Sequence, residues 1–203
     1  ADAVREGFFK LFSDGLIYCG KRLVNWDPVT RTALANDEVE MEEVSGHMYY
    51  LQYPLEDGSG HVTVATTRPE TMLGDTAVAM HPEDPRAKAL KGKMIRLPIV
   101  GRIIPIIEDE YVVMQGVDDP KAALSSGFLK VTPAHDPNDW AIGLRHDLDV
   151  VNVMALDASI SDQHGWEDAS DEAKQFVGLS REEARENILA WFKEHNLLEK
   201  VVD

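Results

Sequence analysis

Residues 128–139 read FLKVTPAHDPND, and this stretch indicates how the chain folds. The run from Phe128 to Thr132 has the composition of a strand, and Pro133 ends it. Asp136 and Pro137 then form a helix start, because Asp is a favoured N-cap and Pro fits the first helical position. A strand that runs into a helix, in a chain rich in short β segments, predicts an α+β fold.

The rest of the chain consists mainly of short β-rich runs separated by Gly and Pro. Residues 56–60 read EDGSG and fit a hairpin loop, whereas residues 157–170 carry little pattern and are expected to be a loop. This pattern predicts a β-barrel-like core with peripheral helices. The expected strands are His47–Tyr53, Val62–Thr67, Thr76–Met80, Met94–Ile99, Ile103–Ile107, Phe128–Thr132 and Val150–Met154.

Helices are expected at four places, each marked by a start signal or by helical spacing. Residues 4–13 place four apolar side chains on one stripe, and Asp84-Pro85 and Asp136-Pro137 look like capped starts. The last helix is expected from Ser180, with Glu183 completing a capping box.

Length and composition are those of one sizeable domain. The chain has 203 residues, 44% of them hydrophobic, so we expect a single domain over 1–203 with short linker segments at about 1–20 and 196–203. Cys19 is the only cysteine, which rules out an internal disulfide and fits a reducing, cytoplasmic location. No apolar run approaches the roughly 20 residues that span a bilayer, so no membrane partner is expected.

The charge balance is strongly acidic. The formal net charge is −16, with a sequence pI near 4.7. Nucleic-acid binders normally carry a basic face, so the overall charge argues against this class. A nucleic-acid partner would require a local basic patch or contacts from other domains.

Residues 65–75, ATTRPETMLGD, form the first segment that could carry chemistry. Thr66, Thr67, Arg68 and Thr71 would present hydroxyl groups and a guanidinium at the end of a strand. These groups suit a phosphate or a ribose. A polar turn held by a salt bridge is the alternative interpretation.

Residues 130–139, KVTPAHDPND, form the second such segment. Strand alternation places Lys130 and Thr132 on one face, and Asp136 and Asp139 follow at the helix start. A carboxylate there could pair with a substrate amine. Equally, Asp136 could be the N-cap and Asp139 could favour the helix dipole, and the two roles are compatible. His135 is expected to be a hydrogen-bonded histidine rather than a metal ligand.

Other enzyme classes lack their signatures. The sequence contains no HExxH, CxxC or GxSxG motif, no Walker A motif and no dinucleotide fingerprint. The segment LVNWDP at 23–28 is expected to be structural, with Trp26 in a packing role.

Taken together, these segments resemble the editing insertion of the valyl-tRNA synthetase family, over nearly the whole chain. The matching stretches are ATTRPETMLGDTAVA at 65–79, RLVNWDP at 22–28, KVTPAHDPND at 130–139, GLSREEAR at 178–185 and Leu197-Leu198. The resemblance implies the α+β editing fold shared with leucyl- and isoleucyl-tRNA synthetases. One departure is a longer link in which residues 115–124 look like an insertion, followed by SSG at 125–127.

By the same resemblance, hydrolysis of the ester of mischarged Thr-tRNA(Val) is the expected activity, with threonyl-adenylate as a second candidate substrate. Valyl-tRNA synthetase is the known case of an apolar pocket that cannot strongly reject threonine, and a second hydrolytic site solves the problem. The implied partners are the 3' end of tRNA(Val) and the rest of the synthetase. Alternatives are a leucyl- or isoleucyl-type editing domain and a non-catalytic module that binds the tRNA 3' end.

The resemblance also implies roles for eight residues. Asp136 is expected to hold the substrate ammonium, while Lys130 and Asp139 are candidates for the threonine hydroxyl. Thr66, Thr67, Arg68 and Thr71 are expected near the terminal adenosine and the ester, and Thr132 behind them. The catalytic candidates are Asp136, Lys130 and Thr67; the substrate-binding candidates are Thr66, Arg68, Thr71, Thr132 and Asp139.

We expect a positioned water to attack the ester, without a covalent intermediate, a metal or another cofactor in this domain. ATP and Mg are expected only for a synthetic domain. The HIGH-like and KMSKS-like signatures of such a domain are absent from this sequence.

Overall fold

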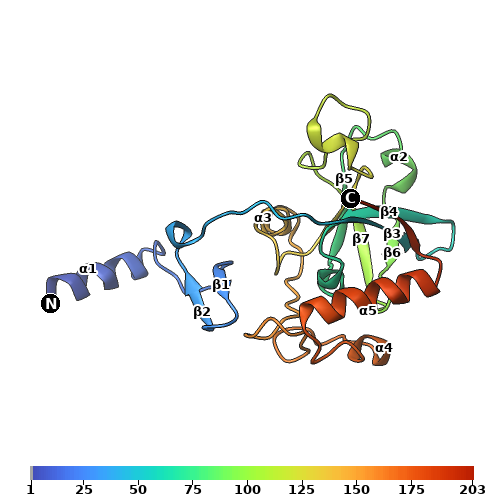
Figure 1. Ribbon diagram of the computed structural model, residues 1–203. Coiled ribbons are helices and arrows are strands. Elements are labelled where there is room, and N and C mark those ends of the chain that lie inside the picture. The colour runs from blue at the N-terminus through green and yellow to red at the C-terminus, as the bar shows by residue number, and fades with distance from the viewer. Residues whose placement is uncertain (1) are drawn as a thin grey trace.

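The computed structural model describes residues 2–203 and shows a mixed α/β fold with three separate sheets (Figure 1). The two-stranded sheet pairs β1 (Asn25–Asp27) with β2 (Thr32–Leu34). The three-stranded sheet has the order β4 (His61–Thr66), β3 (Met48–Pro54), β9 (Leu198–Val202). The four-stranded sheet has the order β6 (Met94–Arg96), β7 (Ile103–Glu108), β5 (Ala77–Met80), β8 (Phe128–Val131).

The sheets are open, so the expected barrel-like core is not confirmed. Strands β6 and β8 are the edges of the four-stranded sheet, and each pairs on one side only. The bridge between Leu55 and Ile95 is an isolated link from the chain after β3 to β6. The ladder of backbone hydrogen bonds therefore does not continue around into a closed barrel.

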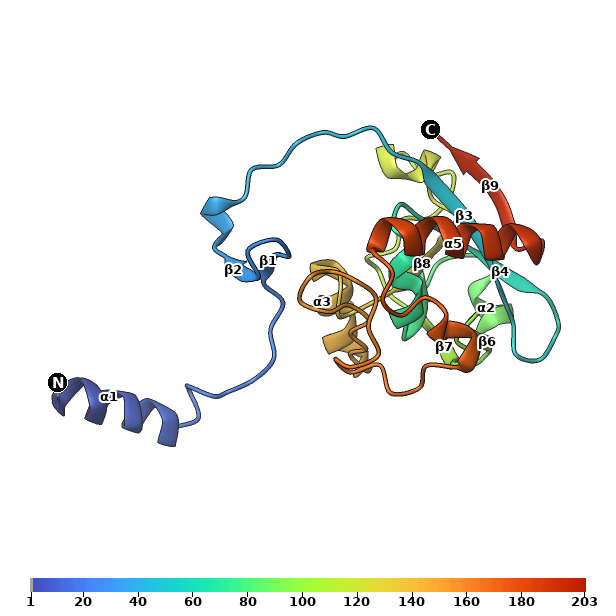
Figure 2. The same ribbon diagram turned by 60° about the horizontal axis from the view of Figure 1, so that its bottom comes forward.

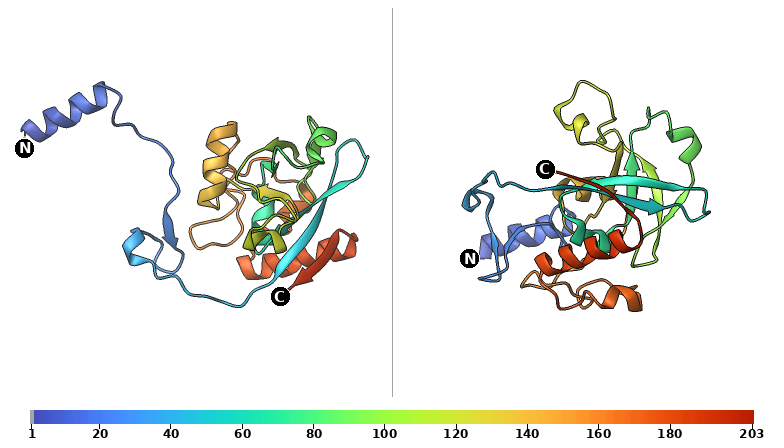
Figure 3. Two further views of the ribbon diagram at one scale, coloured as in Figure 1. Left: turned by 90° about the horizontal axis from the view of Figure 1, so that it is seen from above. Right: turned by 45° about the vertical axis from the view of Figure 1, so that its right-hand side comes forward.

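The two faces of the four-stranded sheet belong to two core clusters, which is why every residue of β5 is buried. The helix α5 (Arg181–Glu194) buries Ala184, Ile188 and Phe192 at a spacing of four residues in the larger core cluster. A smaller cluster joins Ala77, Ala79 and Val131 to Ile142 of α3 (Pro137–His146). The layers on either side of the sheet are visible in Figure 3.

The N-terminal part stands apart from these layers. Helix α1 (Asp2–Ser13) has no buried residue, and Figures 1 and 2 show it away from the sheets.

The short helices are α2 (Ala87–Leu90) and α4 (Asp171–Lys174), together with the 3₁₀ turns η1 (Asn36–Glu38), η2 (Pro69–Gly74) and η3 (Pro120–Ala123). None of the helices within residues 2–203 combines the length and the apolar character needed to span a bilayer.

The strongest local signals in the sequence are confirmed. Asp136 caps α3 by accepting hydrogen bonds from two backbone N–H groups, and Pro137 is its first residue. The capping box of Ser180 and Glu183 starts α5. The expected helix at residues 4–13 and six of the seven expected strands are present, with ends shifted by a few residues.

Three expectations were wrong. Residues 150–154 form no strand, because the Val153 backbone is used in loop contacts: its N–H donates to His135 Nε2 and its carbonyl accepts from Ser161. The helix expected from Asp84-Pro85 begins only at Ala87, since Asp84 accepts from Arg86 instead. Residues 196–203 were expected to be a linker, but they contain β9, paired with β3.

A buried ion pair fixes η2 to α5. The Glu70 carboxylate is almost fully buried and accepts two hydrogen bonds of 2.8 Å from the Arg185 guanidinium. This bidentate geometry is the strong form of a carboxylate–arginine contact. It ties the turn that follows β4 to the helix that covers the core.

Replacing Arg185 should therefore destabilise the fold. We expect Arg185→Ala to lower the free energy of unfolding by about 1.5–3 kcal/mol, because the buried Glu70 carboxylate loses a charged donor. Urea unfolding followed by circular dichroism measures the change. Arg181→Ala is the control in the same helix: its ion pair with Glu182 is exposed, so the expected change is within about 0.5 kcal/mol. Equal losses in both variants would contradict the anchoring role.

Candidate functional site

The ends of β4 and β8 meet at a cavity of about 230 Å³ that gathers the predicted site residues. All eight of them line it: Thr66, Thr67, Arg68, Thr71, Lys130, Thr132, Asp136 and Asp139. The two segments are more than 50 positions apart in sequence. Their convergence is a property of the fold that local chemistry could not establish.

The first wall is the turn from β4 into η2. The Arg68 N–H donates to Thr66 Oγ1 at 3.1 Å, and the Thr71 hydroxyl donates to the Arg68 carbonyl at 3.0 Å. Pro69 at the first position of η2 lets the strand end abruptly. Thr67 is exposed, and its hydroxyl makes no hydrogen bond to another residue within 2–203, so it is free to contact a ligand.

Close packing holds this turn against Thr132, just after β8, and against the loop at Val151. A Cβ atom on Gly74 would lie 2.7 Å from the Val151 carbonyl oxygen and 3.3 Å from Thr132 Cγ2. Only glycine allows the backbone of η2 to approach this closely. Arg102 donates to the carbonyls of Leu73 and Asp75 and fixes the end of the turn.

The second wall is the start of α3, where Asp136 has two structural roles: it caps the helix and it binds Arg68. Its Oδ1 accepts from the N–H groups of Asn138 and Asp139, at 2.8 and 3.2 Å. Its Oδ2 accepts from Arg68 Nη2 at 3.0 Å, and Arg68 also donates to the His135 carbonyl. The polar-turn and capping interpretations therefore both hold. Asp136 is also exposed enough to meet a ligand.

Asp139 is the titratable group of the pocket with a free acceptor. Its Oδ2 accepts from the Thr132 N–H at 2.9 Å, whereas no residue within 2–203 donates to its Oδ1. Burial raises the pKa of Asp139 from 3.8 to about 6; Asp136 and Asp75 raise the pKa too, while Lys130 and the Thr132 N–H lower it. The carboxyl is thus charged at neutral pH and titrates just below it.

Lys130 and Thr132 lie at the back of the pocket and share a fully buried partner, Asp75. The Lys130 ammonium donates to Asp75 Oδ1 at 2.9 Å, and the Thr132 hydroxyl donates to the same oxygen at 2.6 Å. Lys130 also donates to Thr132 Oγ1. The Thr132 hydroxyl is thereby used as donor and as acceptor, so it supports the wall instead of facing a ligand.

His135 has a structural role, as expected. Its Nε2 accepts from the Val153 N–H at 3.2 Å, and burial lowers the pKa of His135 to about 4, with Lys130 and Arg68 adding to the effect. The ring is therefore neutral at physiological pH. Across residues 2–203, no group of three or more His, Cys, Asp and Glu side chains could hold a metal ion.

Sequence reasoning missed the lining residues that lie outside the two motifs. Met48 comes from the start of β3, Leu129 from β8, and Tyr111 from the loop before the insertion, while Asn138 lies within a motif but was given no role. The three apolar or aromatic side chains carried no chemical signal in the sequence. Asp75, which ends the first motif, was also given no role. The signal that could have identified it is an acidic residue next to an apolar strand.

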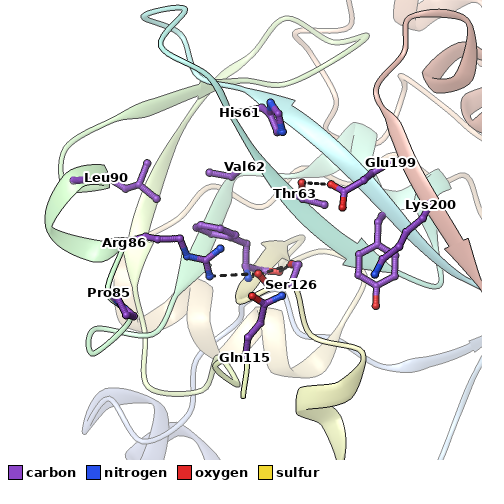
Figure 4. Close-up of a pocket in the computed structure, with 13 residues that line it drawn as sticks. His61, Val62, Thr63, Pro85, Arg86, Leu90, Gln115, Ser126, Glu199 and Lys200 are labelled. Atoms are coloured by element: carbon purple, nitrogen blue, oxygen red, sulfur yellow. Dashed lines mark hydrogen bonds between the residues drawn. The ribbon is translucent and has the colours of Figure 1, made fainter. Parts of the chain in front are cut away.

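A larger cavity of about 600 Å³ lies between the start of β4, α2 and the C-terminal strand (Figure 4). None of the eight predicted residues lines it. Its guanidinium, from Arg86, is neutralised by the two Asp84 oxygens and stacks on the Phe128 ring. The cavity therefore offers no concentrated chemistry comparable with that of the smaller pocket.

Comparison with known proteins gives the family. The profile described as tRNA synthetases class I (I, L, M and V) matches residues 1–201. The chain belongs to this family. Among curated relatives, the valine–tRNA ligases of Geobacillus stearothermophilus and Protochlamydia amoebophila are each 52% identical over 98% of the chain, which covers 21% and 19% of their lengths. The chain thus spans about a fifth of these relatives.

Solved structures agree on the fold of this class I segment. The ternary complex of Agrobacterium radiobacter K84 agnB2 LeuRS with tRNA and LeuAMS matches 97% of the chain and 31% of that protein, with a TM-score of 0.55 at 18% identity. The structure of GlLeuRS-CP1 matches 77% of the chain and 99% of that fragment, with a TM-score of 0.50 at 13% identity. The shared feature is the overall fold.

The raised pKa of Asp139 predicts how stability depends on pH. Between pH 3.8 and about 6 the folded state keeps the Asp139 proton that the unfolded state loses, so this group costs stability as the pH rises through that window. Asp139→Asn removes the cost and keeps an acceptor for the Thr132 N–H. We expect the variant to match the unsubstituted chain at pH 4 and to be more stable at pH 7.5, by up to about 2 kcal/mol.

Chemical unfolding at both pH values tests this. Asp84→Asn is the control of opposite sign, because the Arg86 side chain lowers the pKa of Asp84. Its stability should fall relative to the unsubstituted chain as the pH rises. An Asp139→Asn variant with the same difference at pH 4 and pH 7.5 would show that Asp139 does not titrate in this range.

Proposed function

We propose that this chain is the editing segment of a valyl-tRNA synthetase and hydrolyses the ester of Thr-tRNA(Val), with threonyl-adenylate as a second candidate substrate. The observation that carries the proposal is the convergence of both motifs on one polar cavity. A family match alone would leave the site unspecified. The cavity supplies carboxylates, an ammonium and free hydroxyls within one small volume.

The acidic helix start suits the amino group of the substrate. Asp136 and Asp139 both lie at the first turn of α3 and line the cavity. An α-ammonium placed between them would gain charge-assisted hydrogen bonds. Arg68 donates to Asp136 Oδ2 at the rim of the cavity, where about half of the Arg68 side chain is exposed, so it can move toward the phosphate or ribose of the terminal nucleotide.

The back of the cavity suits the threonine hydroxyl. Lys130 has three N–H donors, of which two are used by Asp75 and Thr132, and Asp139 Oδ1 is an unused acceptor. A threonine hydroxyl can accept from Lys130 and donate to Asp139. The valine methyl group would leave each of these groups unpaired, at a cost of about 1–3 kcal/mol per group. The site thus selects against valine.

A water molecule is the proposed nucleophile. Thr67 is exposed in the cavity and its hydroxyl has no partner within residues 2–203, so we assign it to hold that water beside the ester carbonyl. Thr66 and Thr71 line the same wall and complete the contact to the terminal adenosine. The reaction needs no metal or cofactor from this segment, and ATP and Mg belong to the synthetic part of the enzyme.

The partners follow from this assignment. The tRNA(Val) 3' end enters the cavity, and the remaining four-fifths of the synthetase supply most tRNA contacts, since phosphate contacts dominate affinity and this chain carries a net charge of −16. The chain by itself should bind tRNA weakly. High enzyme concentration is therefore required in any assay.

Deacylation tests the proposal directly. The chain is incubated with Thr-tRNA(Val), Val-tRNA(Val) and Val-tRNA(Ile), with heat-denatured protein as the blank. Selective loss of threonine is the expected result. Preference for Val-tRNA(Ile) would move the assignment to an isoleucyl-type site. Binding of a threonyl-adenosine analogue without any hydrolysis would leave a non-catalytic module that binds the tRNA 3' end.

Two substitutions separate the roles of Asp136. Asparagine caps helices as well as aspartate does, so Asp136→Asn keeps the start of α3 but removes the charge and the Oδ2 acceptor of the half-exposed Arg68. We expect kcat/KM for Thr-tRNA(Val) to fall about 10- to 100-fold with little change in Tm, the effect of losing a hydrogen bond to a charged group. Asp136→Ala should lose activity and also stability. If Asp136→Asn deacylates at the unsubstituted rate, then Asp136 only caps the helix.

A further inference from the structure

The Asp75 carboxylate is fully buried and lies outside the cavity, yet it contacts two groups that form the back of it. Its Oδ1 accepts from Lys130 Nζ at 2.9 Å and from Thr132 Oγ1 at 2.6 Å, and its Oδ2 accepts from the Tyr53 hydroxyl at 2.8 Å. All three neighbours donate, which fits the ionised carboxylate, because the Lys130 ammonium can only donate and the carboxylate compensates its charge.

Tyr53 connects this carboxylate to the core. Its side chain is fully buried on β3, its ring packs beside Phe192 of α5, and its hydroxyl has Asp75 as its hydrogen-bond partner. Asp75 itself sits at the end of η2, where Arg102 holds its carbonyl. The Asp75 side chain is therefore held by the Tyr53 hydroxyl and its backbone by Arg102, and neither Tyr53 nor Arg102 lines the cavity.

Two properties of the pocket depend on this contact. First, Asp75 fixes the direction of the Lys130 ammonium, since two of its three donors are bound to Asp75 and Thr132. Second, it compensates the Lys130 charge. An uncompensated ammonium at the back of the cavity would repel a second ammonium arriving between Asp136 and Asp139.

We propose that Asp75, supported by Tyr53, is a positioning residue that aims the free Lys130 N–H at the substrate hydroxyl and neutralises the Lys130 charge. This inference rests on the proposed hydrolysis of Thr-tRNA(Val). Asp75 touches no substrate atom and acts through Lys130. Loss of Asp75 should therefore change discrimination between amino acids more than it changes hydrolysis in general.

The test compares kcat/KM for Thr-tRNA(Val) and Val-tRNA(Val) in three variants of the 203-residue chain. Asp75→Asn should lower the threonine-to-valine ratio about tenfold, the worth of one charge-assisted contact, and raise KM for the threonyl ester. Tyr53→Phe removes only the bond to Oδ2 and, as the milder variant, should lower the ratio by about twofold. Asp84→Asn makes the same chemical change at a buried aspartate paired with Arg86, outside the cavity, and should leave the ratio unchanged.

A double-mutant cycle that combines Asp75→Asn with Lys130→Met distinguishes positioning of Lys130 from a general loss of stability. If Asp75 acts through Lys130, Asp75→Asn should change the ratio by less than about twofold in the Lys130→Met background. Equal loss of threonine and valine hydrolysis, or the same tenfold effect in both backgrounds, would overturn the proposal. If Asp75→Asn fails to fold, Tyr53→Phe becomes the test. An unchanged threonine-to-valine ratio in Tyr53→Phe would then overturn the proposal.

Failure of the proposed function would look different. In that case the unsubstituted chain hydrolyses neither ester, and a crystal structure of Asp75→Asn decides the positioning claim. Lys130 Nζ should then leave Thr132 Oγ1 and move into the cavity. An ammonium that stays bound to Thr132 would show that Asp75 does not position it.

Discussion

The hydrogen bonds that converge on the buried Asp75 carboxylate are the interaction on which the site depends. They join three parts of the chain: Tyr53 of β3, Asp75 at the end of η2, and Lys130 of β8 with Thr132 just after that strand. Burying a carboxylate is costly unless it is paired and fully hydrogen-bonded, and here burial raises its pKa while Lys130, Thr132 and Tyr53 oppose that rise. The buried carboxylate lies where the two motifs meet, and its hydrogen bonds offset the cost of burying it. A hydrophobic contact could join the same strands, but it would not set the direction of an ammonium.

The same groups carry structure and proposed chemistry together. Asp136 caps α3 with one oxygen and binds Arg68 with the other, and Asp139 binds the Thr132 N–H with one oxygen while the other stays free. A cap must lie at a helix start, where N–H groups point outward, and that is also where an anionic site is held most rigidly. Capping is therefore the means by which these carboxylates are kept in place, rather than an alternative to their use.

Features that neighbouring residues determine could be predicted from the sequence, whereas features that depend on distant residues could not. The caps at Asp136 and Ser180 and most strands were predicted because a few neighbouring residues determine them. Closure of the sheet was not confirmed, because it depends on pairings between distant edges such as β6 and β8. Residues 150–154 look like a strand, yet the His135 ring takes the Val153 N–H. All eight predicted site residues share one cavity, but Asp75 was missed because its importance comes from partners 22 and 55 positions away.

The acidity of the chain, which seemed to oppose a nucleic-acid substrate, agrees with the local charges of the cavity. Three carboxylates (Asp75, Asp136 and Asp139) surround two cations (Lys130 and Arg68), and both cations are already paired. Above the Asp139 pKa of about 6 the site is therefore net negative. Such a site attracts an amino group and does little to bind phosphates. In the proposed function, this site therefore recognises the amino acid, and most tRNA contacts are assigned to the rest of the synthetase.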